Sequence, residues 1–276
     1  MLLKTVSELR DSLRSFREKQ NSIGFVPTMG ALHIGHLSLV KRALSENDVV
    51  VISIFVNPTQ FNNQEDLKNY PRTLDEDLKL LEKFEKCVIF APNINEIYPQ
   101  NDVFTPLDLG NLDKVLEGKF RPKHFQGVVH VVYNFFQIIM PKKAYFGMKD
   151  FQQLAVIKYM NQYFGFPIEI VPCETLREET GLAYSSRNMR LSNNEKEAAL
   201  IIWKTLVFIK ENKNLFSPMA LREKAITYFK QGNLELEYLE IVDEKSFDTA
   251  SDWSSNNVCC IAAYCGNVRL IDNLLL

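Results

Sequence analysis

The sequence has few cysteines, little excess charge and no long apolar run, and each shortage excludes a class of protein. Its 276 residues include five cysteines without paired spacing, which disfavours a disulfide framework and a structural zinc site. The net charge of −2 leaves no broad basic surface for nucleic acid. The sequence lacks both a run of about 18 apolar residues and the apolar core of a signal peptide. We therefore expect a cytoplasmic protein that binds neither nucleic acid nor membrane.

The remaining composition is that of an ordinary globular protein, with 46% hydrophobic and 24% charged residues. A helix is expected over residues 4–20, with Ser7 as its N-cap, because apolar residues recur there every three or four positions. The strand expected at residues 48–56 is nearly continuous in β-branched side chains, as in a sheet covered on both faces. Strands and helices alternate up to about residue 172, which predicts an α/β fold with a doubly wound parallel sheet.

The pattern changes after Arg190. Two helices, expected over residues 193–211 and 218–231, precede three segments that alternate like antiparallel strands. We therefore divide the chain into a larger α/β domain, residues 1–174, and a smaller α+β domain, residues 175–276.

Three polar segments follow directly after expected strands, at residues 28–36, 57–61 and 147–153. In a doubly wound sheet, ligands bind beyond the carboxyl ends of the strands. We therefore expect the three segments to converge on one site.

The first segment, Pro27–His36, ends in two of the four histidines of the chain. A helix that begins here offers unpaired N–H groups and partial positive charge to phosphates. On a helix, His33 and His36 would share one face and could stabilise a charged transition state. Gly30 and Gly35 leave room for a nucleotide close to the backbone. These features predict an ATP site; the alternatives are two incidental histidines or a zinc pair, which lacks a third ligand.

The next polar segments supply amides and charges. Asn57 and Gln60 can both donate to and accept from hydroxyl and carboxylate groups, although an ordinary Asn-Pro turn would also account for Asn57. Lys149 offers a mobile charge for a phosphate. Asp150 could bind a ribose hydroxyl or a magnesium-bound water, or form a surface pair with the lysine.

Two further segments leave alternatives open. Arg121, Lys123 and His124 precede a helix, where they form either an anion site or a mobile basic surface loop. Residues 184–188 offer two hydroxyls and a guanidinium to a triphosphate, or else a pair of helix-capping serines.

Together these segments resemble the pantothenate synthetase (pantoate–β-alanine ligase) family of the nucleotidyltransferase superfamily. That family carries PTMGxLHxGH, FVNPxQF, RPxHFxGV, FGxKDxQQ and GLAxSSRN segments, and all five occur here in order between Pro27 and Asn188. The resemblance implies a Rossmann-like domain with a smaller C-terminal lid, and a homodimer. It implies that ATP, with Mg²⁺, converts pantoate to pantoyl adenylate and pyrophosphate. The adenylate then reacts with β-alanine to give pantothenate and AMP.

The resemblance also implies roles for single residues. His36 would donate a proton to the leaving phosphate, with His33 and Lys149 as further catalytic groups. Gln60 and Gln153 would hold pantoate, with Gln60 also near β-alanine and Asn57 in support, and no protein ligand to a metal is implied. The residues expected to contact ATP are Met29, Gly30, Ala31, Leu32, His33, Ile34, Gly35, His36, Gly147, Met148, Lys149, Asp150, Leu176, Tyr184, Ser185, Ser186 and Arg187.

Two positions depart from the family pattern, since Met148 replaces a common acid and Tyr184 a common aliphatic residue. Two other functions remain to be distinguished. A nucleotidyltransferase for phosphorylated substrates would share the two histidines but would not need Gln60 and Gln153. A nucleotide-sensing module would need fewer catalytic groups.

Overall fold

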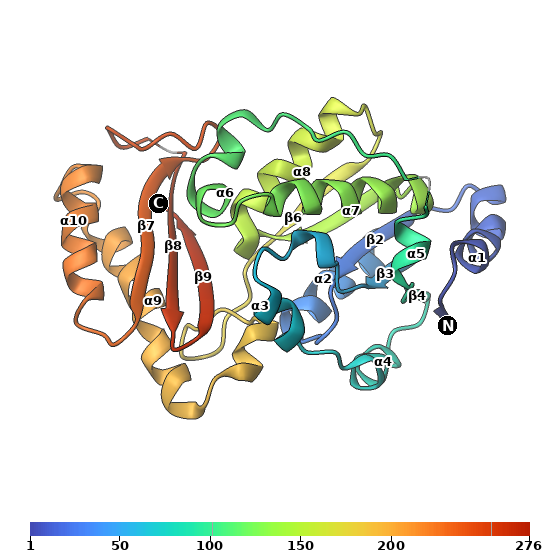
Figure 1. Ribbon diagram of the computed structural model, residues 1–276, viewed down its shortest axis with the longest axis horizontal. Coiled ribbons are helices and arrows are strands. Elements are labelled where there is room, and N and C mark those ends of the chain that lie inside the picture. Colours follow the sequence, from blue (N-terminus) through green and yellow to red (C-terminus); the bar gives the residue numbers. More distant parts are fainter. Residues whose placement is uncertain (101, 255) are drawn as a thin grey trace. The chain divides into compact units, whose positions relative to one another are not determined.

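The structure of the protein, a computed structural model, describes residues 1–100, 102–254 and 256–276. The chain forms two compact units, each described separately below (Figure 1). The first unit comprises residues 1–109, 121–148 and 152–174, and the second comprises residues 110–120, 149–151 and 175–276. Two short segments that precede residue 174 in the sequence therefore pack with the C-terminal part of the chain.

The first unit is built on a six-stranded parallel sheet with the order β1–β4–β3–β2–β5–β6. The chain adds β3 and β4 on one side of β2, and then β5 and β6 on the other side. The strand order therefore reverses between β2 and β5, and such a switch point is where doubly wound sheets bind ligands. The predicted fold class is confirmed. The strands are β1 (Leu2–Leu3), β2 (Ile23–Thr28), β3 (Val49–Ile54), β4 (Cys87–Phe90), β5 (Lys143–Gly147) and β6 (Glu169–Cys173).

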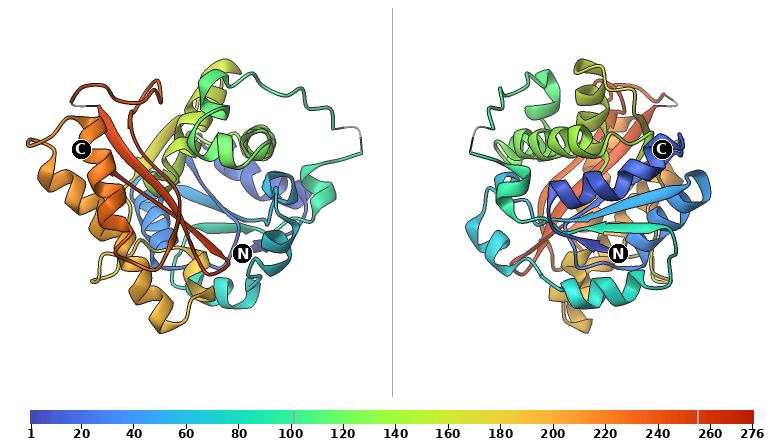
Figure 2. Two further views of the ribbon diagram at one scale, coloured as in Figure 1. Left: turned by 60° about the vertical axis from the view of Figure 1, so that its left-hand side comes forward. Right: turned by 90° about the vertical axis from the view of Figure 1, so that its right-hand side faces the viewer.

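Helices lie on both sides of this sheet (Figure 2). Neighbouring residues of a strand point to opposite faces: Phe25 contacts Phe135 of α7, with ring centroids 5.4 Å apart, whereas Val26 packs with Val40 of α2. This two-sided burial explains why the strand sequences are almost continuously apolar. The helices are α1 (Val6–Glu18), α2 (Ile34–Glu46), α3 (Gln64–Asn69), α4 (Leu74–Leu81), α5 (Ile94–Ile97), α7 (His124–Ile139) and α8 (Phe151–Tyr163).

The N-terminus of α1 differs from the expectation. Thr5, not Ser7, is the N-cap: its hydroxyl accepts from the backbone nitrogen of Glu8 (3.2 Å). The Glu8 carboxylate in turn accepts from the backbone nitrogen of Thr5 (2.9 Å). The choice of Ser7 was wrong because this reciprocal capping box needs a threonine or serine three residues before the glutamate.

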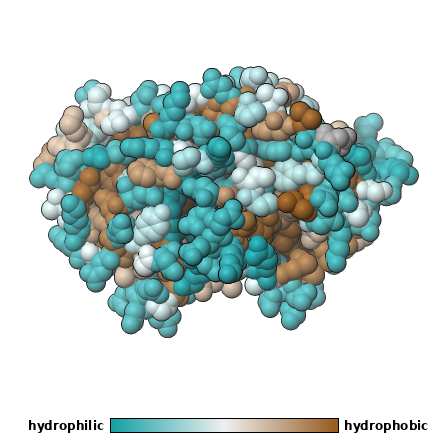
Figure 3. Space-filling model, viewed as in Figure 1, coloured by the Kyte–Doolittle hydropathy of each residue, from teal (hydrophilic) through white to brown (hydrophobic). Residues whose placement is uncertain are grey.

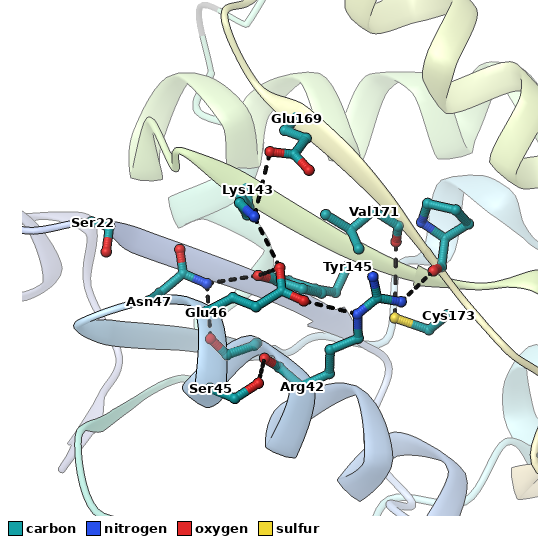
Figure 4. Close-up of polar contacts among 12 residues, drawn as sticks. Ser22, Arg42, Ser45, Glu46, Asn47, Lys143, Tyr145, Glu169, Val171 and Cys173 are labelled. Carbon is teal, nitrogen blue, oxygen red and sulfur yellow. Dashed lines mark hydrogen bonds and ion pairs between the residues drawn. The ribbon is translucent and has the colours of Figure 1, made fainter.

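A cluster of charged and polar groups bonds the C-terminal half of α2 to the sheet (Figure 4). Glu46 accepts from the Lys143 ammonium (2.9 Å) and the Tyr145 hydroxyl (3.0 Å), and Arg42 donates to the Pro172 carbonyl (2.8 Å). The hydrogen bond from Lys143 is the largest of several effects that lower the pKa of Glu46 to about 2. These contacts join α2 to β5 and β6, so they also fix the position of the other end of α2.

The second unit contains a three-stranded antiparallel sheet formed by β7 (Glu235–Asp243), β8 (Asn257–Cys265) and β9 (Val268–Leu275). Its core also includes apolar residues of α9 (Asn193–Asn212) and α10 (Pro218–Phe229). The expected succession of two helices and three antiparallel strands is confirmed.

Residues 110–120 belong to this unit because charged groups bond them to its sheet. The guanidinium of Arg269 binds the carboxylates of Glu117 (2.7 Å) and Glu237. The hydroxyl of Tyr238 donates to Glu117 (2.8 Å). The segment holds a 3₁₀ turn, Gly110–Asp113, and the short helix α6 (Leu116–Phe120).

The face of the molecule drawn in Figure 3 is mostly hydrophilic, and its hydrophobic areas are scattered. Single exposed apolar side chains are normal in folded proteins. Within the ranges that the structure describes, no helix combines the length and apolar character needed to cross a membrane.

Candidate active site

The carboxyl ends of three adjacent strands carry the predicted polar segments. Strands β3, β2 and β5 are parallel neighbours, and they end at Ile54, Thr28 and Gly147. The expected convergence is therefore confirmed for the parts of these segments that lie in the first unit. Gln153 belongs to this group as the third residue of α8, whereas Lys149 and Asp150 belong to the second unit.

The loop after β2 has a backbone that few sequences could adopt. Gly30 and Ala31 both have positive φ angles, of 78° and 49°. A Cβ atom on Gly30 would lie 3.0 Å from a carboxylate oxygen of Asp77 and 3.1 Å from Ile54. The same carboxylate accepts from the backbone nitrogens of Ala31 (3.0 Å) and Leu32 (2.7 Å). Glycine is therefore required at position 30, and Asp77 holds the loop in this form.

Sequence reasoning missed Asp77. It lies in the first turn of α4 beside Asp75 and Glu76, where acidic residues are common for reasons of helix polarity alone. Only 1% of Asp77 is exposed. Loss of solvent raises its pKa, and the hydrogen bonds from the loop oppose that rise.

The two histidines lie together, but not on one helical face. Helix α2 begins at Ile34, and His33 is its N-cap with an extended backbone, so the expectation that both residues are helical was wrong. Their ring centroids are nevertheless 4.0 Å apart. The Nδ1 atom of His36 accepts from the backbone nitrogen of His33 (3.3 Å). A neutral His36 therefore carries its proton on Nε2.

Asn57 and Gln60 are brought together with Met29. The Asn57 amide nitrogen donates to the side-chain oxygen of Gln60 (3.0 Å) and to the carbonyl of Gly127 (3.1 Å). The Gln60 amide nitrogen lies 3.1 Å from the sulfur of Met29. Residues that follow two different strands thus meet in one polar cluster.

Helix α7 packs directly against the 3₁₀ turn Pro58–Gln60 and so supports this cluster. A Cβ atom on Gly127 would lie 2.4 Å from the carbonyl oxygen of Thr59, so only glycine lets the helix approach so closely. The Nδ1 atom of His124 lies 2.7 Å from the backbone oxygen of Gln60. His124 is buried and begins helix α7, so the mobile surface loop was wrong for this residue.

Tyr98, to which the sequence assigned no role, extends the cluster. Its hydroxyl donates to the side-chain oxygen of Asn57 (2.7 Å). Its ring meets His130 edge to face at 4.7 Å, and His130 bonds Asp102 (2.6 Å). A tyrosine in an irregular segment gives no sequence signal of such a contact, because its partner lies 41 residues away.

The candidate residues of the second unit form hydrogen bonds with other residues of that unit. The backbone oxygen of Lys149 accepts from the side-chain amide of Asn273 (2.8 Å). Ser185 caps the 3₁₀ helix Ser186–Arg190 by accepting from the backbone nitrogen of Arg187 (3.3 Å), which confirms the capping alternative for this serine. The carbonyl of Leu176 accepts from the backbone nitrogen of Tyr184 (3.1 Å).

Arg177 fixes the loop that leads to Tyr184. Its guanidinium forms two hydrogen bonds with Asp272 (2.6 and 2.9 Å) and lies 3.8 Å from the centre of the Trp203 ring. It also donates to the carbonyl of Gly181 (3.2 Å). Asp272 lies 95 residues from Arg177, so this ion pair could not be found from sequence spacing.

Across the described part of the chain, no group of three or more histidine, cysteine, aspartate or glutamate side chains is arranged to hold a metal ion. All five cysteines are free thiols.

Comparison with known proteins identifies the family. A family model described as pantoate-β-alanine ligase matches residues 1–275. The pantothenate synthetase of Phocaeicola vulgatus is 50% identical over 282 residues, which cover 99% of this chain and 98% of that protein. The pantothenate synthetase of Cytophaga hutchinsonii is 46% identical, with the same coverage.

Solved structures agree with this assignment. The pantothenate synthetase of Thermus thermophilus superposes with a TM-score of 0.93 at 40% identity, over 99% of this chain and 98% of that chain. The pantoate-β-alanine ligase of Francisella tularensis, solved with β-γ ATP and β-alanine, gives a TM-score of 0.83 at 37% identity, over 100% and 97%. The chain therefore belongs to the pantoate–β-alanine ligase family, the pantothenate synthetases, and is a ligase that joins pantoate to β-alanine.

Proposed function

We propose that the ligase reaction proceeds in two steps with ATP as co-substrate. A carboxylate oxygen of pantoate attacks the α-phosphorus of ATP, and the bond from that phosphorus to pyrophosphate breaks. The amine of β-alanine then attacks the acyl carbon of pantoyl adenylate, loses a proton and displaces AMP. The single observation that carries this proposal is the position of His33 and His36. They lie at the start of α2, directly after β2 and beside the switch point of the sheet.

The phosphates are assigned to the start of α2. In-line attack at phosphorus needs positioning and charge stabilisation rather than a protein nucleophile. The Nε2–H of His36 can donate a proton or hydrogen bond to the departing pyrophosphate, with His33 and Lys149 adding stabilisation. The proposed ATP contacts are Met29 to His36, Gly147 to Asp150, Leu176, and Tyr184 to Arg187.

The hydroxy acid is assigned to the amides. Gln60 and Gln153 would hold the hydroxyl and carboxylate groups of pantoate, because amides both donate and accept. Asn57 supports Gln60 through the hydrogen bond between their side chains. The β-alanine bound by the Francisella relative supports the same second substrate here.

Mg²⁺ is proposed to enter with ATP. The ion would bind the substrate phosphates and keep several of its waters, and Asp150, an exposed carboxylate beside Lys149, could accept from one of those waters. When bound, the ion would neutralise charge on the triphosphate.

We also propose a cytoplasmic homodimer in which residues 175–276 act as a lid to a domain of residues 1–174. Family resemblance supports the dimer and lid, and the free thiols suit a reducing compartment.

Isotope transfer tests the adenylate step. Pantoate carrying a heavy oxygen isotope in its carboxylate should pass one labelled oxygen to AMP, because that oxygen bridges carbon and phosphorus in the adenylate. The measurement is mass spectrometry of the products after incubation with ATP, Mg²⁺ and β-alanine. Label in inorganic phosphate, with ADP as coproduct, would show an acyl phosphate instead. AMP formation that is equally fast without pantoate would also exclude the proposal.

A further inference from the structure

We infer that Tyr98 is a positioning residue for Gln60: its hydroxyl holds the side chain of Asn57, and Asn57 orients the Gln60 amide so that its NH₂ group faces the hydroxy acid. This inference rests on the proposed contact between Gln60 and pantoate. It adds two points to that contact, namely the direction of the hydrogen bond and a residue that helps to hold the side chain that sets this direction.

The orientation of Asn57 is fixed by two backbone groups that cannot exchange roles. Its side-chain oxygen faces the backbone N–H of Thr59 (3.3 Å), which can only donate. Its side-chain nitrogen faces the carbonyl of Gly127 (3.1 Å), which can only accept. Reversing the amide would place a donor against a donor and an acceptor against an acceptor. Since only 1% of Asn57 is exposed, water cannot satisfy the mismatched groups.

The orientation of Gln60 follows from that of Asn57. The Asn57 nitrogen lies 3.0 Å from Gln60, so the Gln60 atom at this point must be an acceptor, the oxygen Oε1. The Gln60 nitrogen Nε2 then points the other way, toward the sulfur of Met29 (3.1 Å). Thioether sulfur is a weak acceptor, so a substrate oxygen can replace it at little cost. Gln60 therefore offers donors to the ligand, while its oxygen is already engaged.

Tyr98 completes this series of hydrogen bonds. Because the Asn57 oxygen is an acceptor, the Tyr98 hydroxyl 2.7 Å away must be the donor. The hydroxyl of Thr59 also donates to this oxygen (2.9 Å). The Tyr98 ring is held by edge contacts with His130 (4.7 Å) and a tilted contact with Phe55 (6.2 Å), so the hydroxyl cannot swing away freely. Burial raises the pKa of Tyr98 to about 12, so the donor proton is kept at neutral pH.

The direction of the hydrogen bonds from Tyr98 through Asn57 to Gln60 selects the ligand. An NH₂ group held outward recognises an acceptor, such as a hydroxyl or carboxylate oxygen of a hydroxy acid. An ammonium group, which can only donate, finds no partner at this atom. The structure thus assigns Nε2 of Gln60 to an oxygen of pantoate.

A double-mutant cycle tests the inference on the full-length enzyme. Tyr98→Phe removes one hydrogen bond and keeps the ring, so KM for pantoate should rise roughly three- to tenfold, with KM for ATP unchanged. In a Gln60→Ala background, Tyr98→Phe should have no further effect on pantoate, because Tyr98 acts only through Gln60. Gln60→Glu, which keeps the size but offers no donor, should weaken pantoate binding as much as Gln60→Ala.

The matched control is Tyr133→Phe, whose hydroxyl bonds only the nearby Gln137 among the described contacts and should leave every KM unchanged. The inference is overturned if Tyr98→Phe leaves KM for pantoate unchanged, or if its effect is equally large with and without Gln60. Thermal unfolding of each variant separates a general loss of stability from the selective effect. If Gln60→Ala itself leaves KM for pantoate unchanged, the proposed contact between Gln60 and pantoate is wrong, and so is the inferred role of Tyr98.

Discussion

A carboxylate oxygen of Asp77 lies 2.7 Å from the backbone nitrogen of Leu32, although the two residues are 45 positions apart. The other oxygen accepts from the neighbouring nitrogen of Ala31, whose φ angle of 49° is unfavourable for any residue that has a Cβ atom. Asp77 thus satisfies two backbone N–H groups of this loop. The histidines that follow depend on it for their position.

Asp77→Asn should therefore lower both stability and turnover. The amide keeps one acceptor but turns its NH₂ group toward the second backbone N–H, which leaves a buried donor unsatisfied at a cost of about 1–3 kcal/mol. Denaturant unfolding and steady-state kinetics measure the two effects. Asp75→Asn, an exposed change on the same helix, is the control. Equal behaviour of the two variants would show that the loop does not need Asp77.

His36→Ala should reduce kcat by roughly a hundredfold or more, as the loss of a transition-state donor often does. The backbone N–H of His33 also loses its acceptor in this variant. Thermal unfolding should therefore be measured, to show whether the variant is less stable than the wild type. Ser45→Ala on the exposed side of the same helix should leave turnover intact. Turnover near that of the wild type in His36→Ala would remove this residue from the mechanism.

Asn273→Ala should weaken ATP binding more than pantoate binding. The change removes the donor to the backbone oxygen of Lys149, so the segment that carries the proposed phosphate ligand loses a fixed contact. We expect KM for ATP to rise about threefold or more, in line with one lost hydrogen bond. Asn194→Ala, an exposed substitution in the same unit, provides the comparison. A rise in KM for pantoate alone would contradict the expectation.

Glu46→Gln should show an acid-dependent loss of stability. The native pKa of Glu46, about 2, lies below its ordinary value of 4.5, so ionised Glu46 stabilises the folded state at all pH values above that ordinary value. This contribution is lost as pH falls from about 4.5 to about 2. We expect the variant to be about 1 kcal/mol less stable than wild type at pH 7.

Denaturant unfolding of both proteins across this pH range measures the difference, which should shrink toward the acid end. Glu18→Gln, a change at an exposed carboxylate, is the control. A gap for Glu46→Gln that stayed constant between pH 7 and pH 2 would show that the cluster in Figure 4 contributes nothing electrostatic to folding.

The fold class, and the polar segments that follow the strands, could be predicted from the sequence. Apolar strands buried on both faces leave a pattern that can be read locally, as at residues 48–56. Parallel strands then bring their carboxyl ends to one edge, which is why the segments after β2, β3 and β5 could be assigned to one place. Caps were harder, since Thr5 and Ser7 differ only in which of them faces Glu8.

The contacts that hold the functional side chains could not be predicted from the sequence and became visible in the fold. Asp77 reaches Leu32, Tyr98 reaches Asn57, and Asn273 reaches Lys149 across 45, 41 and 124 residues. His124, one of three basic residues in sequence, proved to be a buried support for the backbone of Gln60. Hydrogen bonds depend on distances of a few tenths of an ångström between groups brought together by packing. No local pattern encodes such distances, so the sequence showed which groups do the chemistry and the fold showed what keeps them in place.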